Sequence, residues 1–264
     1  MNRIKWLFFL TSRTLTIQLG IHQKQKPFIH FVCGYPRSGT TWFSEMLSSY
    51  LGVPCPRHYL LPITYPSVIH THSDPYSRIS NCFYIVRDGR DALVSFYYYI
   101  ANKMKDKSYV ARTRFLRLLG RELKAEDIEQ NFSRFLEVIF NNPLSTSTHW
   151  GAHAIGWLHK SILFPGSVIF LKYENLRTNT SLEFSHVLQQ KFGIVDEKLV
   201  EEISMSHQFD LQKRKFPKDH KTYLRKGASG DWKSVFNQES REIFDHFAGD
   251  ALIELEYEKD HSWV

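Results

Sequence analysis

The stretch Phe28–Cys33 (FIHFVC), followed by Gly34–Thr41 (GYPRSGTT), decides how this chain folds. Its first part is an apolar run rich in β-formers that meets a glycine at once, which predicts a buried strand entering a tight loop. From Thr40 to Tyr50 the apolar residues have helical spacing. The glycine-containing loop is therefore expected between a strand and a helix.

The composition of this loop suits an anion. Glycines let backbone N–H groups approach a ligand closely, and the start of the helix adds unpaired N–H groups with a partial positive charge. Ser38, Thr40 and Thr41 add hydroxyl donors. We therefore expect a cradle for a phosphate or sulfate group, with a ligand-free glycine turn as the plain alternative.

The rest of the chain alternates strands with helices. Strands are predicted at Val68–His70, Cys82–Val86 and Ser167–Leu171, and helices at Asp91–Met104, Phe115–Leu119, Phe132–Phe140, Trp150–Leu163, Ser181–Phe192, Glu197–Met205 and Ser240–Leu255. This alternation predicts an α/β fold in one domain over residues 1–264, with a central, mainly parallel sheet flanked by helices. Ligands of such sheets bind beyond the carboxyl ends of the strands.

The charge balance predicts an anionic partner. Among 264 residues, 34 Lys and Arg oppose 27 Asp and Glu, a net charge of +7, and nucleic acid, anionic lipid and a nucleotide all satisfy it. The segment Gln212–Lys226 (QKRKFPKDHKTYLRK) is strongly basic, and residues 212–230 are broken by Pro217, Gly227 and Gly230. We expect a loop there.

The cysteines and the N-terminus bear on the compartment. Cys33, Cys55 and Cys82 form no CxxC pair, so buried thiols in a reducing, cytoplasmic compartment are expected. In the N-terminal extension, residues 1–27, the apolar run Trp6–Leu10 is too short for a signal peptide or a membrane span. We expect a short surface strand or helix, with weak membrane contact as the alternative.

The loop departs from the Walker A pattern GxxxxGK[ST] of kinases and ATPases. Thr40 stands where that pattern has lysine, and the cation lies inside the loop, at Arg37. Asp88 is the nearest candidate for a Mg²⁺ ligand, but it comes one residue after its strand and beside Arg87. A P-loop small-molecule kinase that uses Mg-ATP is therefore a disfavoured alternative.

Four ordered segments resemble the PAPS-dependent sulfotransferases, where PAPS is 3′-phosphoadenosine-5′-phosphosulfate. Tyr35–Trp42 (YPRSGTTW) resembles their 5′-phosphosulfate loop, and Ile69–His72 (IHTH) the strand that ends in their catalytic histidine. Ile85–Ser95 (IVRDGRDALVS) is similar to their 3′-phosphate segment, and Arg225–Lys233 (RKGASGDWK) to their C-terminal cofactor loop. A weaker match lies at Phe170–Leu176, and the resemblance spans about residues 28–236.

The resemblance implies a P-loop, nucleotide-kinase-like fold and transfer of a sulfuryl group from PAPS to a hydroxyl or amine, without a metal, leaving adenosine 3′,5′-bisphosphate (PAP). It implies that residues 212–230 cover the cofactor and that Trp42 stacks on adenine, with plain helix core as the alternative for Trp42. The cofactor-binding positions it implies are Arg37, Ser38, Gly39, Thr40, Thr41, Trp42, Arg87, Ser95, Arg225, Lys226 and Gly227, with Tyr173 and Ser206 as weaker candidates.

The resemblance also assigns chemistry. His72 is implied as the base, and an unperturbed imidazole, with a pKa near 6.5, suits that role. His70, two residues earlier on the same face of the strand, is its rival. Arg37 replaces the lysine usual in soluble relatives. Because its guanidinium keeps its proton, we expect Arg37 to stabilise the leaving phosphate electrostatically.

The acceptor stays open. We expect a small molecule, glycan or lipid, no nucleic-acid partner, and no particular oligomeric state. Aromatic and histidine side chains are candidates for an acceptor pocket, although core is the better prediction for most of them: Tyr97, Tyr98, Tyr99, Trp150, His153 and Trp157. His149 and His153 are four residues apart, a spacing that can bind zinc, but no accompanying carboxylate or cysteine pattern in the sequence supports a zinc site. A non-catalytic anion-binding protein of the same fold is the last alternative.

Overall fold

A computed structural model describes residues 3–22, 28–56, 66–107, 111–143, 146–208, 211 and 229–264. The chain forms two compact units. The sheet unit comprises Met1–Gly34, Gly39–Val86 and Trp157–Gln208. The helical unit comprises Tyr35–Ser38, Arg87–Gly156 and Phe209–Val264. The prediction of one domain over residues 1–264 stays a prediction.

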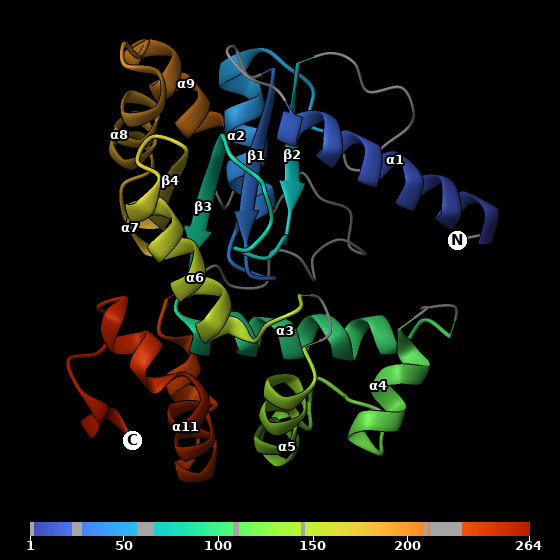
Figure 1. The fold of residues 1–264 in the computed structure, drawn as a ribbon. Coiled ribbons are helices and arrows are strands. Elements are labelled where there is room, and N and C mark those ends of the chain that lie inside the picture. The colour runs from blue at the N-terminus through green and yellow to red at the C-terminus, as the bar shows by residue number, and fades with distance from the viewer. Residues whose placement is uncertain are drawn as a thin grey trace. The chain divides into compact units, whose positions relative to one another are not determined.

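The sheet unit contains a parallel four-stranded sheet in the order β2-β1-β3-β4 (Figure 1). Its strands are β1 (Ile29–Gly34), β2 (Ser67–Thr71), β3 (Cys82–Val86) and β4 (Val168–Lys172). Strands β1 and β3 are buried along their whole length, as expected for a sheet covered on both faces. The predicted parallel α/β fold is confirmed, each strand within one or two residues of its expected range.

Helices cover both faces of the sheet. Val32 and Phe83 share one core cluster with α2 (Thr40–Leu51), α8 (Thr180–Phe192) and α9 (Glu197–Ser206). Residues of the opposite face meet other helices. A Cβ at Gly20 of α1 (Arg3–His22) would touch Phe31, and Trp157 of α6 (Trp150–Leu163) stacks on Tyr84. A short helix, α7 (Tyr173–Thr178), follows β4 directly.

Helix α1 corrects the prediction of a short surface element. It is 20 residues long, although the apolar run that prompted the prediction has only five. The apolar run was a poor guide because the buried residues of α1 include small and hydroxyl-bearing ones, Ser12, Thr16 and Gly20. Among the described residues, no helix combines the length and apolar character needed to cross a membrane.

The helical unit packs around aromatic side chains. Its elements are α3 (Gly89–Met104), α4 (Arg112–Leu119), α5 (Ile128–Asn141), the first part of α6, η2 (Asp231–Ser234), α11 (Gln238–Glu254) and η3 (His261–Trp263). Helix α3 begins at an N-cap, where the Asp88 carboxylate accepts a bond from the Arg90 amide. Tyr97, Trp150 and His153 are fully buried, in line with the core prediction, whereas Tyr98 and Tyr99 are half-buried.

Candidate functional site

Gly34 and Gly39 lie where the loop leaves the sheet unit and returns to it. A Cβ at Gly34 would lie 2.6 Å from the Ile85 carbonyl oxygen and 2.7 Å from Cγ2 of Thr40. Gly39 has φ 88°, and a Cβ there would lie 2.6 Å from the Tyr173 ring. Both positions therefore require glycine, the first for close approach and the second also for its left-handed backbone.

We expect Gly39→Ala to destabilise the protein by about 2–5 kcal/mol, from about 1–2 kcal/mol of left-handed strain plus about 1–3 kcal/mol of overpacking against Tyr173. Gly52→Ala is the matched control, because Gly52 has φ 62° with open space around its Cβ position. The Gly52→Ala variant should be destabilised only by the left-handed backbone strain. Thermal or denaturant unfolding measures both variants, and equal losses would show that the Tyr173 contact is not tight.

In the helical unit, the structure brings together three predicted residues that are far apart in sequence. Arg37 Nε donates to Ser95 Oγ at 3.1 Å, and Arg87 Nη1 donates to the Arg37 carbonyl oxygen at 3.2 Å. The Arg37 guanidinium also lies 5.3 Å from the centre of the Tyr99 ring, within cation–π range. Tyr99 was not predicted to hold Arg37; its position one helical turn after Ser95 was the available signal.

The loop carries two features that are costly without a ligand. Arg37 has φ 75°, in the left-handed region that residues other than glycine rarely adopt. The Ser38 hydroxyl is fully buried, and no described residue hydrogen-bonds to it. A buried unpaired hydroxyl costs about 1–3 kcal/mol, and backbone strain of this kind clusters at functional sites. Both features fit a loop that donates to an anion.

The two histidines at the end of β2 in the sheet unit have distinct partners. His72 Nδ1 lies 2.6 Å from the Gly34 carbonyl oxygen. A carbonyl can only accept, so the neutral His72 ring carries its proton on Nδ1 and its lone pair on Nε2. His70 Nε2 lies 2.8 Å from Thr40 Oγ1, and the two imidazole rings meet edge to face at 4.7 Å. His72 thus has the tautomer of a base.

Of the predicted adenosine contacts in the sheet unit, Trp42 and Tyr173 are buried, whereas Ser206 is exposed. Trp42 is 7% exposed, donates from Nε1 to the His207 carbonyl oxygen at 2.8 Å, and meets Tyr173 edge to face. The Ser206 hydroxyl donates to the Ile203 carbonyl oxygen at 2.9 Å. Thr41 is exposed on the first turn of α2. Core packing accounts for Trp42 without a ligand, so its stacking on adenine stays a proposal.

Gly230 and Trp232 are held by a residue that sequence reasoning missed, Asp91. Arg225, Lys226 and Gly227 lie outside the described residues. The buried Asp91 carboxylate accepts from the amides of Gly230 at 2.7 Å and Trp232 at 3.0 Å. Burial raises the pKa of Asp91, while Arg87 and the two amides oppose that shift. Asp91 thereby ties the chain that follows the basic loop to α3.

Arg90 pairs with acidic groups and is buried. Its guanidinium donates to both carboxylate oxygens of Asp88, at 3.0 and 2.8 Å, and also to Glu258. It stacks over Trp232, with the guanidinium carbon 3.9 Å from the ring centre. The Asp88 carboxylate is therefore committed to Arg90 and to its N-cap, which argues against the kinase role of a Mg²⁺ ligand.

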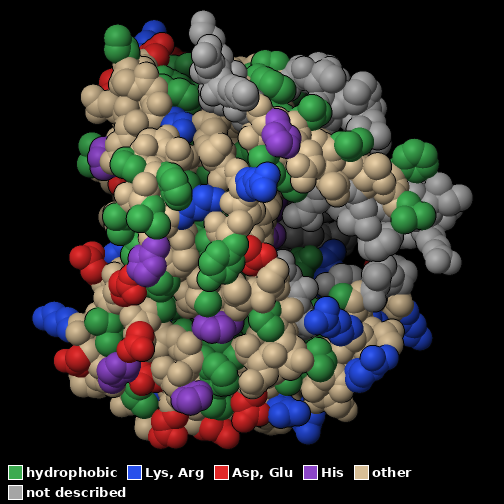
Figure 2. All heavy atoms as spheres, viewed as in Figure 1, with side chains coloured by type: hydrophobic (Ala, Val, Ile, Leu, Met, Phe, Trp, Pro, Cys, Tyr) green, Lys and Arg blue, Asp and Glu red, His purple; other side chains and the backbone are tan. Residues whose placement is uncertain are grey.

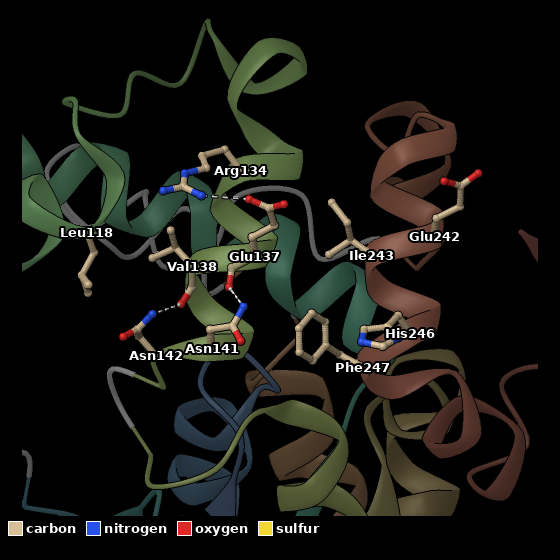
Figure 3. A pocket seen from close by; sticks show the side chains of 10 residues that line it. All are labelled: Leu118, Arg134, Glu137, Val138, Asn141, Asn142, Glu242, Ile243, His246 and Phe247. Atoms are coloured by element: carbon tan, nitrogen blue, oxygen red, sulfur yellow. Dashed lines mark hydrogen bonds and ion pairs between the residues drawn. The ribbon is translucent and has the colours of Figure 1, made fainter.

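A separate cavity of about 670 Å³ lies in the helical unit between α5 and α11. Figure 3 shows Arg134 paired with Glu137 on α5, facing His246 and Phe247 on α11. None of the predicted site residues lines it. Within the described part of the chain, no group of three or more His, Cys, Asp or Glu is arranged to hold a metal, including the histidines near α6.

Comparison with known protein families identifies the family of this chain. The model of the sulfotransferase domain family matches residues 66–256, which is more than half of the chain. The chain belongs to the sulfotransferase domain family. The matched range includes His72, Arg87 and Ser95. It does not include the glycine-containing loop Gly34–Thr41, which comes earlier in the chain.

Relatives of this sulfotransferase agree over most of its length. A flavonol sulfotransferase-like protein of Flaveria bidentis is 25% identical, over 94% of this chain and 90% of its own. Flavonol 4′-sulfotransferase of Flaveria chlorifolia is 24% identical, over 87% of this chain and 80% of its own. The solved structure of mouse sulfotransferase SULT7A1 complexed with PAP has a TM-score of 0.68 at 18% identity, covering 94% of this chain and 92% of its own. The predicted family, fold and enzyme class are confirmed.

Proposed function

We propose that this sulfotransferase uses PAPS as donor and binds it through the loop Gly34–Trp42, Arg87 and Ser95, with His72 as base. The main support for the proposal is that Arg37 hydrogen-bonds to both Ser95 and Arg87. The family resemblance of the sequence assigns Arg37 to the phosphosulfate end of PAPS, and Arg87 and Ser95 to its 3′-phosphate. The buried Ser38 hydroxyl supports the fit, because an anion would satisfy it.

His72 and Arg37 have different roles in the proposed reaction: His72 transfers a proton, and Arg37 stabilises negative charge. When bound, PAPS supplies the sulfuryl group. His72 Nε2 takes the proton of the acceptor hydroxyl or amine as that atom bonds to sulfur, while Gly34 holds the other ring nitrogen. Arg37 stabilises the charge that builds on the phosphate oxygen as the sulfur–oxygen bond breaks. The guanidinium keeps its proton throughout, so His72 alone moves one.

The class of the acceptor molecule and the compartment of the protein are also proposals. Two relatives are named for flavonols, which are hydroxylated small molecules. We propose an acceptor with a hydroxyl or amine on a small molecule, glycan or lipid. Cys33 and Cys82 are buried thiols outside any disulfide, which supports a reducing, cytoplasmic setting.

We expect PAP at 100 times its dissociation constant to stabilise the protein by about 2.7 kcal/mol, raising the melting temperature by about 5–10 °C. Differential scanning fluorimetry measures the shift. Adenosine 5′-monophosphate is the matched control, because it lacks the 3′-phosphate assigned to Arg87 and Ser95, and should shift the transition far less. Stabilisation by Mg-ATP in place of PAP would favour the kinase alternative and contradict the proposal.

A further inference from the structure

His72 lies one residue beyond the end of its strand. The register of β2 with β1 runs as far as Thr71, which lies opposite Cys33, and His72 follows that last pair. Among the described strands, β2 is an outer one, with β1 as its neighbour in the sheet. A catalytic group must be held within about 0.5 Å of its productive position. Contacts outside the sheet ladder must therefore contribute to the position of His72.

The residue after His72 is fixed through its backbone. Trp157 Nε1 donates to the Ser73 carbonyl oxygen at 3.0 Å, and Cys33 Sγ donates to the same oxygen at 3.3 Å. The Ser73 amide donates to Thr71 Oγ1 at 3.2 Å. These bonds hold the backbone on the C-terminal side of His72 at the point where the strand has ended.

Trp157 is a rigid support for this carbonyl. Its side chain is fully buried. Its ring stacks on Tyr84 of β3, with 5.3 Å between the ring centres and 16° between the planes. Tyr84 stacks in turn on Phe170 of β4, at 5.2 Å and 22°. An indole fixed by two strands in this way offers its N–H group in one direction.

The part of α6 in the sheet unit has two distinct faces. Ile162 is 66% exposed, and hydrophobic side chains reach the surface near the end of this helix (Figure 2). The Lys160 ammonium group donates to the carbonyl oxygens of Pro75, at 3.1 Å, and Ser77, at 2.6 Å. Trp157 and Lys160 are three positions apart and therefore share a face of the helix. That face holds the segment that follows the predicted base.

We propose that Trp157 is a positioning residue for His72, whose imidazole it keeps in place through the Ser73 carbonyl group. This proposal rests on the proposed role of His72 as base. Cys33, the second donor to Ser73, precedes Gly34, whose carbonyl oxygen lies 2.6 Å from His72 Nδ1. The ring of His72 and the residue after it are thus both held to the end of β1, and Trp157 supports them from α6.

Trp157→Phe tests this role, because phenylalanine keeps an aromatic ring against Tyr84 but has no N–H group. We expect kcat to fall by about three- to tenfold, from the loss of one neutral hydrogen bond, with KM for PAPS unchanged. In a His72→Ala background the same substitution should leave the residual rate unchanged, since no imidazole remains to be positioned. Phe170→Leu is the matched control. It shortens the same stack from its far side and keeps the bond to Ser73, so kcat should equal that of the unchanged protein.

Cys33→Ala tests the same point if Trp157→Phe does not fold, because it removes the other donor to Ser73. A thiol is a weak donor, so kcat should fall by less than in Trp157→Phe, and again only when His72 is present. An equal fold-loss with and without His72 would overturn the proposal, as would a raised KM for PAPS at unchanged kcat. Full activity of His72→Ala alone would remove the proposed base, and the role of Trp157 with it. Thermal unfolding of each variant checks that the fold is kept.

Discussion

His72→Ala should lower the rate of sulfuryl transfer by about 10²–10⁴-fold while leaving PAP binding close to that of the unchanged protein. The loss follows from the hydrogen bond of His72 Nδ1 to Gly34, which directs the lone pair of the neutral ring to Nε2. Without that ring, the acceptor keeps its proton as it attacks sulfur. PAPS-dependent transfer across a panel of acceptors, together with PAP titration by fluorimetry, measures the two effects separately.

His70→Ala is the matched control, because His70 lies on the same strand and its ring contacts His72. It loses the bond to Thr40, worth about 1 kcal/mol, which lowers the rate roughly fivefold if that bond orients the loop. A transfer rate that collapses in His70→Ala and survives in His72→Ala would reverse the assignment of the base. If both variants keep full activity, the proton leaves by another route. Loss of PAP binding in His72→Ala would point to a structural role.

Arg37→Ala should lower kcat by about 10²–10³-fold, the typical cost of removing one donor that stabilises charge in the transition state. Arg37→Lys keeps the charge but not the planar fork that reaches Ser95 and lies over Tyr99. We therefore expect Arg37→Lys to fall between Arg37→Ala and the unchanged protein. Steady-state kinetics with PAPS, at saturating acceptor, measures kcat for each.

Tyr99→Leu separates the position of Arg37 from its charge. It removes a cation–π contact worth about 0.5–1 kcal/mol, so kcat should fall by only about two- to fivefold. Arg134→Ala is the control for loss of an arginine, because the Arg134 side chain is 61% exposed and pairs only at the surface, with Glu137. Equal kcat in Arg37→Ala and Arg134→Ala would contradict the role of Arg37.

The sequence by itself determined the centre of the sheet unit. The run before Gly34 and the apolar spacing after Thr40 predict a strand, a loop and a helix, since both periodicities are local properties of the chain. The positions of His72 and Arg87 directly after strands follow from the same local patterns. The family resemblance, also carried by short contiguous segments, supplied their roles.

Only the tertiary structure decided which groups meet. The bonds that tie Arg37 to Ser95 and His72 to Gly34 join residues 58 and 38 positions apart, and local periodicity says nothing about side chains at that separation. The packing of α1 through Ser12, Thr16 and Gly20 was likewise hidden, because close packing against the sheet selects small residues that no apolar pattern marks. Local order follows from backbone and side-chain preferences, whereas partners and burial depend on how distant segments pack.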